Sequence, residues 1–130
     1  MIVDSSAMVA IVWAEPEAKP FIAAIVGSDR ATMSAANYLE ASIVIDRDRN
    51  PAISARLDAT IHQLEIEIAP VTASQAKLAR QAYRDFGKGS GHKAQFNFGD
   101  SFAYALAMER GEPLLYKGDD FEYAGLARVV

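Results

Sequence analysis

Several acidic residues stand where a chain rarely places a charge. Asp4 interrupts the apolar opening MIVDSSAMVAIVW, and Glu40 falls inside the helix-like run SAANYLEASIVI. Asp100 opens the run DSFAYALAM directly after a glycine, and the pair Asp119 and Asp120 lies just past PLLY. A carboxylate in apolar surroundings is unfavourable unless something pairs with it. These acids are therefore the first candidates for chemistry.

Carboxylates gathered at one place suit a hard divalent cation. Clustered carboxylates raise one another's pKa, and a cation between them keeps them ionised. The chain has no cysteine and only two histidines, which excludes disulfides, thiolate zinc sites and cysteine nucleophiles. Oxygen ligands favour Mg²⁺ or Mn²⁺. Such a site activates water and stabilises charge that develops on a phosphoryl group.

Alternating strand and helix patterns predict the elements that must position these acids. Apolar or alternating runs predict strands, at 1–4, 31–33, 65–71 and 113–116, with a last one in the tail 126–130. Helical spacing, caps and breakers predict helices, at 6–13, 16–26, 34–50, 51–64, 72–87 and 99–111. Glycines predict a loop at 87–97 and a turn at 117–121.

This order of elements predicts an α/β fold in which a parallel sheet is covered by helices on both faces. Ligands of such sheets bind at the carboxyl ends of the strands. Asp4 and the Asp119–Asp120 pair follow strands, Asp100 starts a helix at the same rim, and Glu40 is within reach of it. The length of 130 residues predicts one domain over 1–130.

Each acid also has an ordinary structural explanation. Asp4 and Asp100 stand where helix N-caps occur, and an aspartate doublet is common in turns. Glu40 has Ala36, Asn37, Ile43 and Val44 as helix neighbours, none of them basic, and it could still reach water from the edge of an apolar stripe. A metal site therefore requires that all the acids meet at one rim of the sheet.

Four stretches in this order resemble the PIN-domain ribonucleases, and among them the VapC-type toxins of toxin–antitoxin pairs: VDSSAMVAI, SAANYLEASIVI, FNFGDSFAYALA and PLLYKGDDF. The resemblance covers nearly the whole chain. It implies a three-layer α/β/α sandwich with a short central parallel sheet. It also implies a Mg²⁺- or Mn²⁺-dependent endoribonuclease, the toxin of a type II pair, with tRNA as one plausible target.

The same resemblance assigns roles to residues. Asp4, Glu40 and Asp100 match the first three acids of the family's catalytic set and would hold the metal or orient the attacking water. The fourth acid falls in KGDDF, where Asp120 aligns best and Asp119 is the alternative. Ser6 matches a hydroxyl position beside the metal site.

A basic strip offers a path for RNA on a chain whose net charge is −4. Five of its residues lie between positions 77 and 93 with a single acid among them: Lys77, Arg80, Arg84, Lys88 and Lys93. The first three share one helix face by their spacing, and a local basic surface attracts phosphates. Lys117 is a further candidate for phosphate contact. A solvated helix face is the alternative explanation of this strip.

Aromatic residues and the second histidine have mainly structural readings. Phe96 and Phe98 could stack on RNA bases, although core packing against the next helix is the favoured interpretation. Trp13 and Tyr38 are predicted to be core or interface residues. His92, in the glycine loop, could contact RNA, but an exposed residue without a role is the favoured prediction.

Partners and location complete the sequence-based expectations. The resemblance implies a cognate antitoxin, whose tail covers the acidic groove, and a homodimer. The segment 10–26 is apolar enough for either contact, or for plain core. The start of the chain resembles no secretory signal, and no run reaches the ~18 apolar residues of a membrane span, so a cytoplasmic protein is predicted.

Two other functions remain open at this stage. One is a different Mg²⁺-dependent phosphohydrolase or a receiver-like domain with an acid pocket. A haloacid-dehalogenase phosphatase would carry an aspartate two residues after Asp4, where Ser6 stands instead. The other is a non-catalytic binding module in which the acids are only caps.

Overall fold

Four short parallel strands form the centre of the computed structural model, which describes residues 1–130. They are β1 (Ile2–Val3), β2 (Thr32–Ser34), β3 (Glu67–Ala69) and β4 (Leu114–Leu115). The sheet order is β3-β2-β1-β4, and Ile2 of β1 pairs with both Thr32 and Leu114. Strand β1 is thus central, and Asp4 stands at its carboxyl end.

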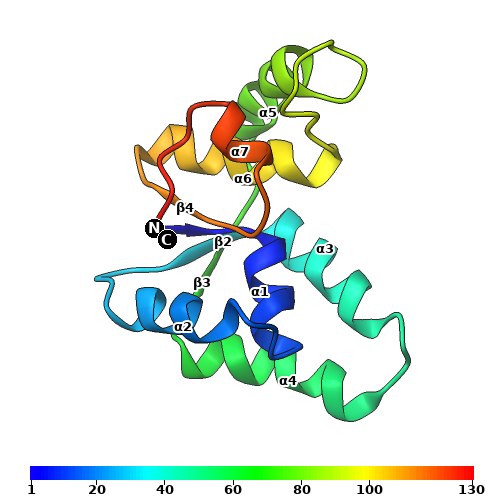
Figure 1. The fold of residues 1–130 in the computed structure, drawn as a ribbon, viewed down its shortest axis with the longest axis vertical. Coiled ribbons are helices and arrows are strands. Elements are labelled where there is room, and N and C mark those ends of the chain that lie inside the picture. Colours follow the sequence, from blue (N-terminus) through cyan, green and yellow to red (C-terminus); the bar gives the residue numbers. More distant parts are fainter.

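Helices cover both faces of this sheet. Helices α1 to α4 lie on one side and α5 to α7 on the other (Figure 1). The helices are α1 (Ser5–Val12), α2 (Ala18–Val26), α3 (Ala35–Asp46), α4 (Pro51–Gln63), α5 (Ala73–Phe86), α6 (Phe98–Arg110) and α7 (Asp120–Tyr123). The predicted three-layer α/β/α sandwich with a parallel sheet is confirmed.

The sheet separates two hydrophobic clusters, because successive strand residues point to opposite faces. Val3 and Leu115 belong to the cluster under α1 to α4. Ile2 and Leu114, their immediate neighbours, belong to the cluster that packs against α6. All four side chains are fully buried. Strands β1 and β4 are short but apolar on both faces, as the covered centre of such a sheet requires.

Several predicted boundaries were wrong for local reasons. The second helix begins at Ala18 rather than at Pro16, which lies in the preceding turn. The third helix ends at Asp46, because Arg49 takes a left-handed conformation (φ 52°) before α4 begins. The tail makes only an isolated bridge between Leu114 and Arg128 instead of a last strand. The predicted turn at 117–121 contains the start of α7.

Helix lengths also bear on membrane association. No helix of the structure combines the length and the apolar character that crossing a membrane requires.

Candidate metal centre

Asp4 caps α1 with only one of its two carboxylate oxygens. Oδ2 accepts hydrogen bonds from the backbone N–H of Ser6 (3.0 Å) and from its hydroxyl (2.6 Å). Oδ1 is buried and has no hydrogen-bond partner, and the residue is only 2% exposed. Capping therefore accounts for Oδ2 of this carboxylate, whereas Oδ1 is left available to a ligand.

Glu40 reaches the same rim from α3. Its Oε1 accepts a hydrogen bond from the Ser5 hydroxyl and another from Asn37 Nδ2 at 3.3 Å. The carboxylate lies against the backbone of Gly99, so closely that a Cβ on Gly99 would overlap it. Gly99 directly precedes Asp100. The structure thus brings Glu40 beside Asp100, although 60 residues separate them in the sequence.

Asp100 is held at the start of α6 by a capping box. Its N–H donates to Asn97 Oδ1 (2.9 Å), and its Oδ2 accepts from the Asn97 N–H (3.0 Å). Asp100 is 9% exposed. The capping box orients the side chain, and it uses one carboxylate oxygen, as the cap at Asp4 does.

Asp4 and Asp100 are both buried, and neighbouring acids add to the effect of burial on their pKa values. Burial raises the pKa of Asp4 to about 6, and the charge of Glu40 adds to the rise. Burial likewise raises the pKa of Asp100 to about 7, and the charges of Asp4, Asp120 and Glu40 contribute in that order. Hydrogen bonds from the backbone oppose both shifts without cancelling them. Burial therefore favours the neutral form of both carboxyl groups, and neither Asp4 nor Asp100 forms an ion pair with a basic side chain.

The two aspartates after β4 differ in their relation to this rim. Asp120 is the first residue of α7, and its charge raises the pKa of Asp100. Asp119 precedes the helix without making a side-chain cap, and its charge acts on Asp120 and Tyr116 instead. This arrangement favours Asp120 over Asp119 as the fourth acid.

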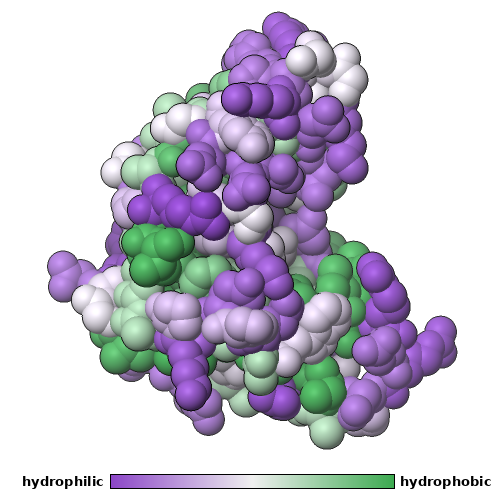
Figure 2. Space-filling model, viewed as in Figure 1, coloured by the Kyte–Doolittle hydropathy of each residue, from purple (hydrophilic) through white to green (hydrophobic).

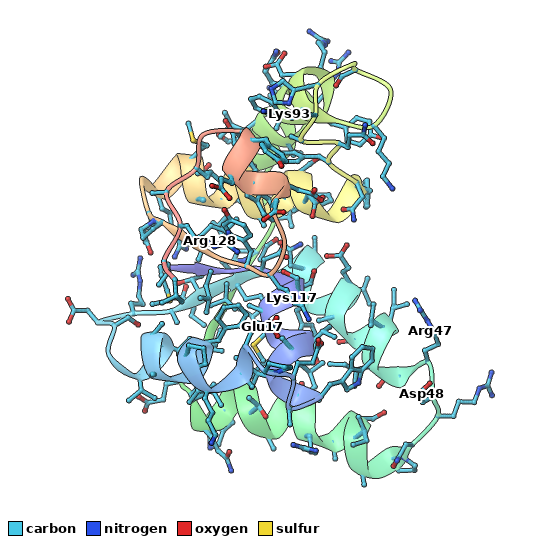
Figure 3. All side chains as sticks on the ribbon, viewed as in Figure 1. Glu17, Arg47, Asp48, Lys93, Lys117 and Arg128 are labelled. Atoms are coloured by element: carbon cyan, nitrogen blue, oxygen red, sulfur yellow. The ribbon has the colours of Figure 1, made fainter.

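Ser6 links the first acid to the loop that carries the fourth. Its hydroxyl donates to Asp4 Oδ2 and accepts from the Lys117 N–H at 3.0 Å. The Lys117 ammonium pairs with Glu15 and with Glu17, the latter at 3.4 Å (Figure 3). Lys117 is therefore engaged with the segment between α1 and α2, and the predicted phosphate contact finds no support in this arrangement.

The residues fit a divalent cation in kind. All the donors are carboxylate oxygens, and the unpartnered Asp4 Oδ1 is the buried atom that a cation would satisfy. No three acidic side chains, however, are arranged to hold one ion directly. Mg²⁺ commonly keeps several waters and takes one or two carboxylates from the protein. The site thus matches a cation held partly through water rather than a closed cage of side chains.

The predicted basic strip is exposed along its whole length, on Lys77, Arg80, Arg84, Lys88 and Lys93. Lys88 is close enough to Asp120 to lower its pKa against the larger effect of burial. Lys93 lies over the Tyr123 ring at 4.7 Å, on α7. The surface at the top of the view, over α5 and the loop that follows it, is largely hydrophilic (Figure 2). The strip therefore approaches the acids from the α5 side.

The predictions for aromatic residues and His92 had mixed outcomes. Phe96 is fully buried as expected, whereas core packing was wrong for Phe98, which is 78% exposed. Trp13 is 43% exposed, and Tyr38 is half-buried with its hydroxyl on Asp58.

His92 is half-buried, and its ring packs edge-on against Phe86 at 5.0 Å. Its Nδ1 accepts from the Ala94 N–H. The imidazole is thus part of the loop's internal structure, and the prediction of an exposed bystander was wrong.

The segment 10–26 contributes six residues to the core, while Trp13 and Val26 in it are exposed. Its buried apolar residues belong to the cluster under α1 to α4, and they are Ala10, Ile11, Val12, Ala18, Phe21 and Ile25. Exposed apolar side chains gather instead in a groove of about 400 Å³ between α3 and the start of α6. The molecule is hollowed between its two helical layers on that side (Figure 2).

Three residues of the site were missed as site residues from the sequence: Ser5, Asn37 and Gly99. Ser5 had a local signal, because a hydroxyl beside an acid at a strand end can turn toward the same ligand. Asn37 stands one helical turn before Glu40, which places the two on one face. Nothing in the sequence indicated that Gly99 would lie under the Glu40 carboxylate.

A family match decides the classification. Residues 1–126 match the family model of the PIN domain. The chain belongs to the PIN-domain family. Curated relatives of this PIN domain include Ribonuclease VapC28 of Mycobacterium tuberculosis, which is 51% identical over 130 residues, spanning 100% of this chain and 98% of the relative. Ribonuclease VapC42 of the same species is 46% identical over 97% of this chain and 96% of its own length.

Solved structures show the same fold. Mycobacterium tuberculosis VapC20, described as a Sarcin-Ricin loop cleaving toxin, superimposes on this PIN domain with a TM-score of 0.75 at 18% identity. The match covers 97% of this chain and 95% of VapC20. FitAcB of Neisseria gonorrhoeae matches with a TM-score of 0.69 over 98% and 94% of the two chains, also at 18% identity.

Proposed function

We propose that this PIN domain, residues 1–130, is an endoribonuclease of the VapC type that requires Mg²⁺ or Mn²⁺ and acts as the toxin of a type II pair. Similarity to VapC ribonucleases along the whole chain supports the ribonuclease activity. One observation carries the metal requirement: Asp4 and Asp100 are buried together without a basic partner. A carboxylate pair of this kind is stable in its charged form only when a cation joins it.

Each acid has a role that its surroundings support. Asp4 and Asp100 would hold the cation, each with the oxygen that its cap leaves over. Glu40 is fixed through Oε1, so Oε2 is the oxygen that orients the attacking water and takes up its proton. Asp120, beside Lys88, would position the water or the leaving end of the RNA. The cation, when bound, supplies a Lewis acid that polarises the phosphodiester and lowers the pKa of water.

The basic strip would bind the RNA backbone and direct it to the acids. We expect Lys88→Ala to raise the KM for RNA several-fold and to leave kcat nearly unchanged, because a phosphate contact of this kind contributes binding rather than chemistry. The salt dependence of binding should also become shallower. Lys19→Ala is the matched control, since Lys19 is an exposed lysine on α2, outside the strip. Equal KM values for Lys88→Ala and Lys19→Ala would show that Lys88 does not contact the RNA.

The substrate we propose is a structured RNA, and tRNA is the first candidate to test. The test incubates the purified protein with total RNA in the presence of EDTA, Mg²⁺ or Mn²⁺ and maps the cut ends. We expect discrete cuts with either metal, ends with a 5′-phosphate and a 3′-hydroxyl, and none in EDTA. Cleavage that persists in EDTA, or that is as fast in Asp4→Asn, would contradict the proposal.

We also propose that the protein forms a homodimer through the apolar residues of the groove between α3 and α6, and that an antitoxin tail covers the acidic rim, which this groove meets at Glu40. The groove carries large exposed apolar side chains, with Leu39 59%, Ile43 58% and Phe98 78% exposed. Exposed apolar patches of this kind mark protein contacts. A protruding Phe98 beside a hollow is a shape that a second copy can complement by two-fold symmetry.

Light scattering during size-exclusion chromatography tests the dimer. Ile43→Glu should produce monomers, because it places a charge inside the contact. Val26→Glu is the control, since Val26 is 70% exposed on α2 and lies outside the groove. A dimer unaffected by Ile43→Glu would assign the contact to another surface.

A further inference from the structure

Asn37 is a buried amide that joins two of the elements that carry the catalytic acids. It lies on α3 and is fully buried. Its Nδ2 donates to the Gly99 carbonyl at 2.9 Å and to Glu40 Oε1 at 3.3 Å. Gly99 is the residue before Asp100. One amide group therefore contacts both the Glu40 carboxylate and the backbone that carries Asp100.

The hydrogen bonds of Glu40 are distributed unevenly between its two oxygens. Asn37 and Ser5 both donate to Oε1, so Oε2 receives no hydrogen bond from either. These two hydrogen bonds restrict the rotamer of Glu40, and Oε2 lies against Gly99 without a hydrogen bond from Asn37 or Ser5. The free oxygen is then available to a water or a cation.

Asn37 does not have the hydrogen bonding that a residue serving only the stability of the fold would have. Its Oδ1 is buried and has no hydrogen-bond partner. A buried polar atom without a partner lowers stability, and an apolar side chain of similar size would avoid that loss. The donor side of the amide must therefore provide something that an apolar residue cannot, and the two groups it contacts are both part of the acidic rim.

We infer that Asn37 is a positioning residue for the metal centre. It holds the Glu40 carboxylate against Gly99 and fixes the distance between Glu40 and Asp100. The inference rests on the proposed metal-dependent function of this rim. Residues that orient metal ligands typically change metal affinity or activity by roughly 10- to 100-fold when they are removed.

The experiment compares wild type with Asn37→Ala and with Asn37→Asp, which keeps the shape of the side chain but replaces both donors with acceptors. Mn²⁺ affinity is measured by calorimetry, and RNA cleavage is measured as kcat and KM. We expect Mn²⁺ affinity to fall about 10-fold or more and the loss of activity to appear in kcat rather than KM. Asn50→Ala is the control, because it removes an exposed asparagine that caps α4, which affects stability without touching the rim.

A double variant tests whether Asn37 acts through Glu40. If it does, adding Asn37→Ala to Glu40→Gln should cause no further loss of Mn²⁺ affinity or kcat. Equal, additive losses would overturn the inference, as would an Asn37→Ala protein that only unfolds at lower temperature while its Mn²⁺ affinity stays at the wild-type value. Should Asn37→Ala not fold, Asn37→Asp and Asn37→Ser are judged by the same Mn²⁺ measurement.

Failure of the proposed function would look different. A wild type that binds Mn²⁺ but cuts no RNA would contradict the ribonuclease proposal, and the Mn²⁺ affinities of the Asn37 variants would still decide the role of Asn37. A wild type that binds no Mn²⁺ would overturn both.

Discussion

The acidic residues at the two edges of the central sheet differ in whether they form ion pairs. At the amino edge, Glu112 pairs with the Met1 ammonium at 2.7 Å and with Arg30 at 3.5 Å. At the carboxyl edge, directly after β1, Asp4 and Asp100 are both buried and neither forms an ion pair. The amino edge therefore contributes to folding stability. The buried acids of the carboxyl edge reduce it, and this edge is where we propose that a cation binds.

The pKa shifts at the two edges have opposite directions. A hydrogen bond and the charge of the Met1 ammonium lower the pKa of Glu112, against a smaller effect of burial. That stabilisation is present at neutral pH and is lost as the pH falls through the lowered pKa. Burial raises the pKa of Asp4 and Asp100. Their contribution is favourable in acid and is lost as the pH rises through about 6 and about 7.

The largest expected effect is on catalysis at the carboxyl edge. Asp100→Asn removes a charge but keeps an acceptor for the Asn97 N–H, so α6 should keep its cap. We expect Mn²⁺-dependent RNA cleavage to fall by at least roughly 10²-fold, measured on a labelled RNA. Asp29→Asn, an exposed acid before β2, should retain wild-type activity. If the Asp100→Asn protein folded and remained active, the acids would have only a structural role as helix caps.

The second effect is on stability as a function of pH. In EDTA, the buried Asp4 should make the protein less stable as the pH rises from 4 to 8, by about 3 kcal/mol at ~1.4 kcal/mol per pKa unit. Asp4→Asn should lack this part of the pH dependence, and Mn²⁺ should restore the stability of the wild type at pH 8. Urea unfolding at several pH values measures both. If the free energy of unfolding changed with pH equally for wild type and Asp4→Asn, the ionisation of Asp4 would not lower the stability of the protein.

The third effect separates folding from function at one glycine. Gly99 lies in the first turn of α6 with an ordinary helical conformation, so alanine should favour the helix by up to about 1 kcal/mol. The added Cβ would overlap the Glu40 carboxylate, however. We expect Gly99→Ala to lose roughly 10- to 100-fold in activity without a comparable loss of stability. Gly27→Ala, at the end of α2, should change activity very little.

The smallest effect lies at the amino edge. Glu112→Gln removes the negative charge that Met1 and Arg30 contact, and we expect a loss of about 1 kcal/mol in the free energy of unfolding at pH 7. The loss should shrink in acid, where Glu112 of the wild type becomes protonated. RNA cleavage per folded molecule should not change. A drop in kcat for Glu112→Gln would show that the two edges are coupled through β1.

The sequence predicted the acids better than it predicted what holds them. Asp4 and Asp100 follow local rules, because strand ends and helix starts can be read from apolar runs and breakers. The partners of Glu40 depend on a contact between Asn37 and Gly99, 62 residues apart, and no local pattern encodes that distance. Phe98 was misplaced for a related reason. The capping box at Asn97 starts the helix one residue before the predicted position, which makes Phe98 its first, exposed residue.

The glycine-rich loop 87–97 is anchored more firmly than its composition suggests. Gly87 and Phe96 form a bridge across its base, and the rings of His92 and Phe96 both rest on Phe86. The loop is thus already folded before the RNA contact that we propose for Lys88 and Lys93. Little conformational entropy remains to be lost on docking, so association should be quick, governed by ionic strength, and accompanied by only a small change in heat capacity.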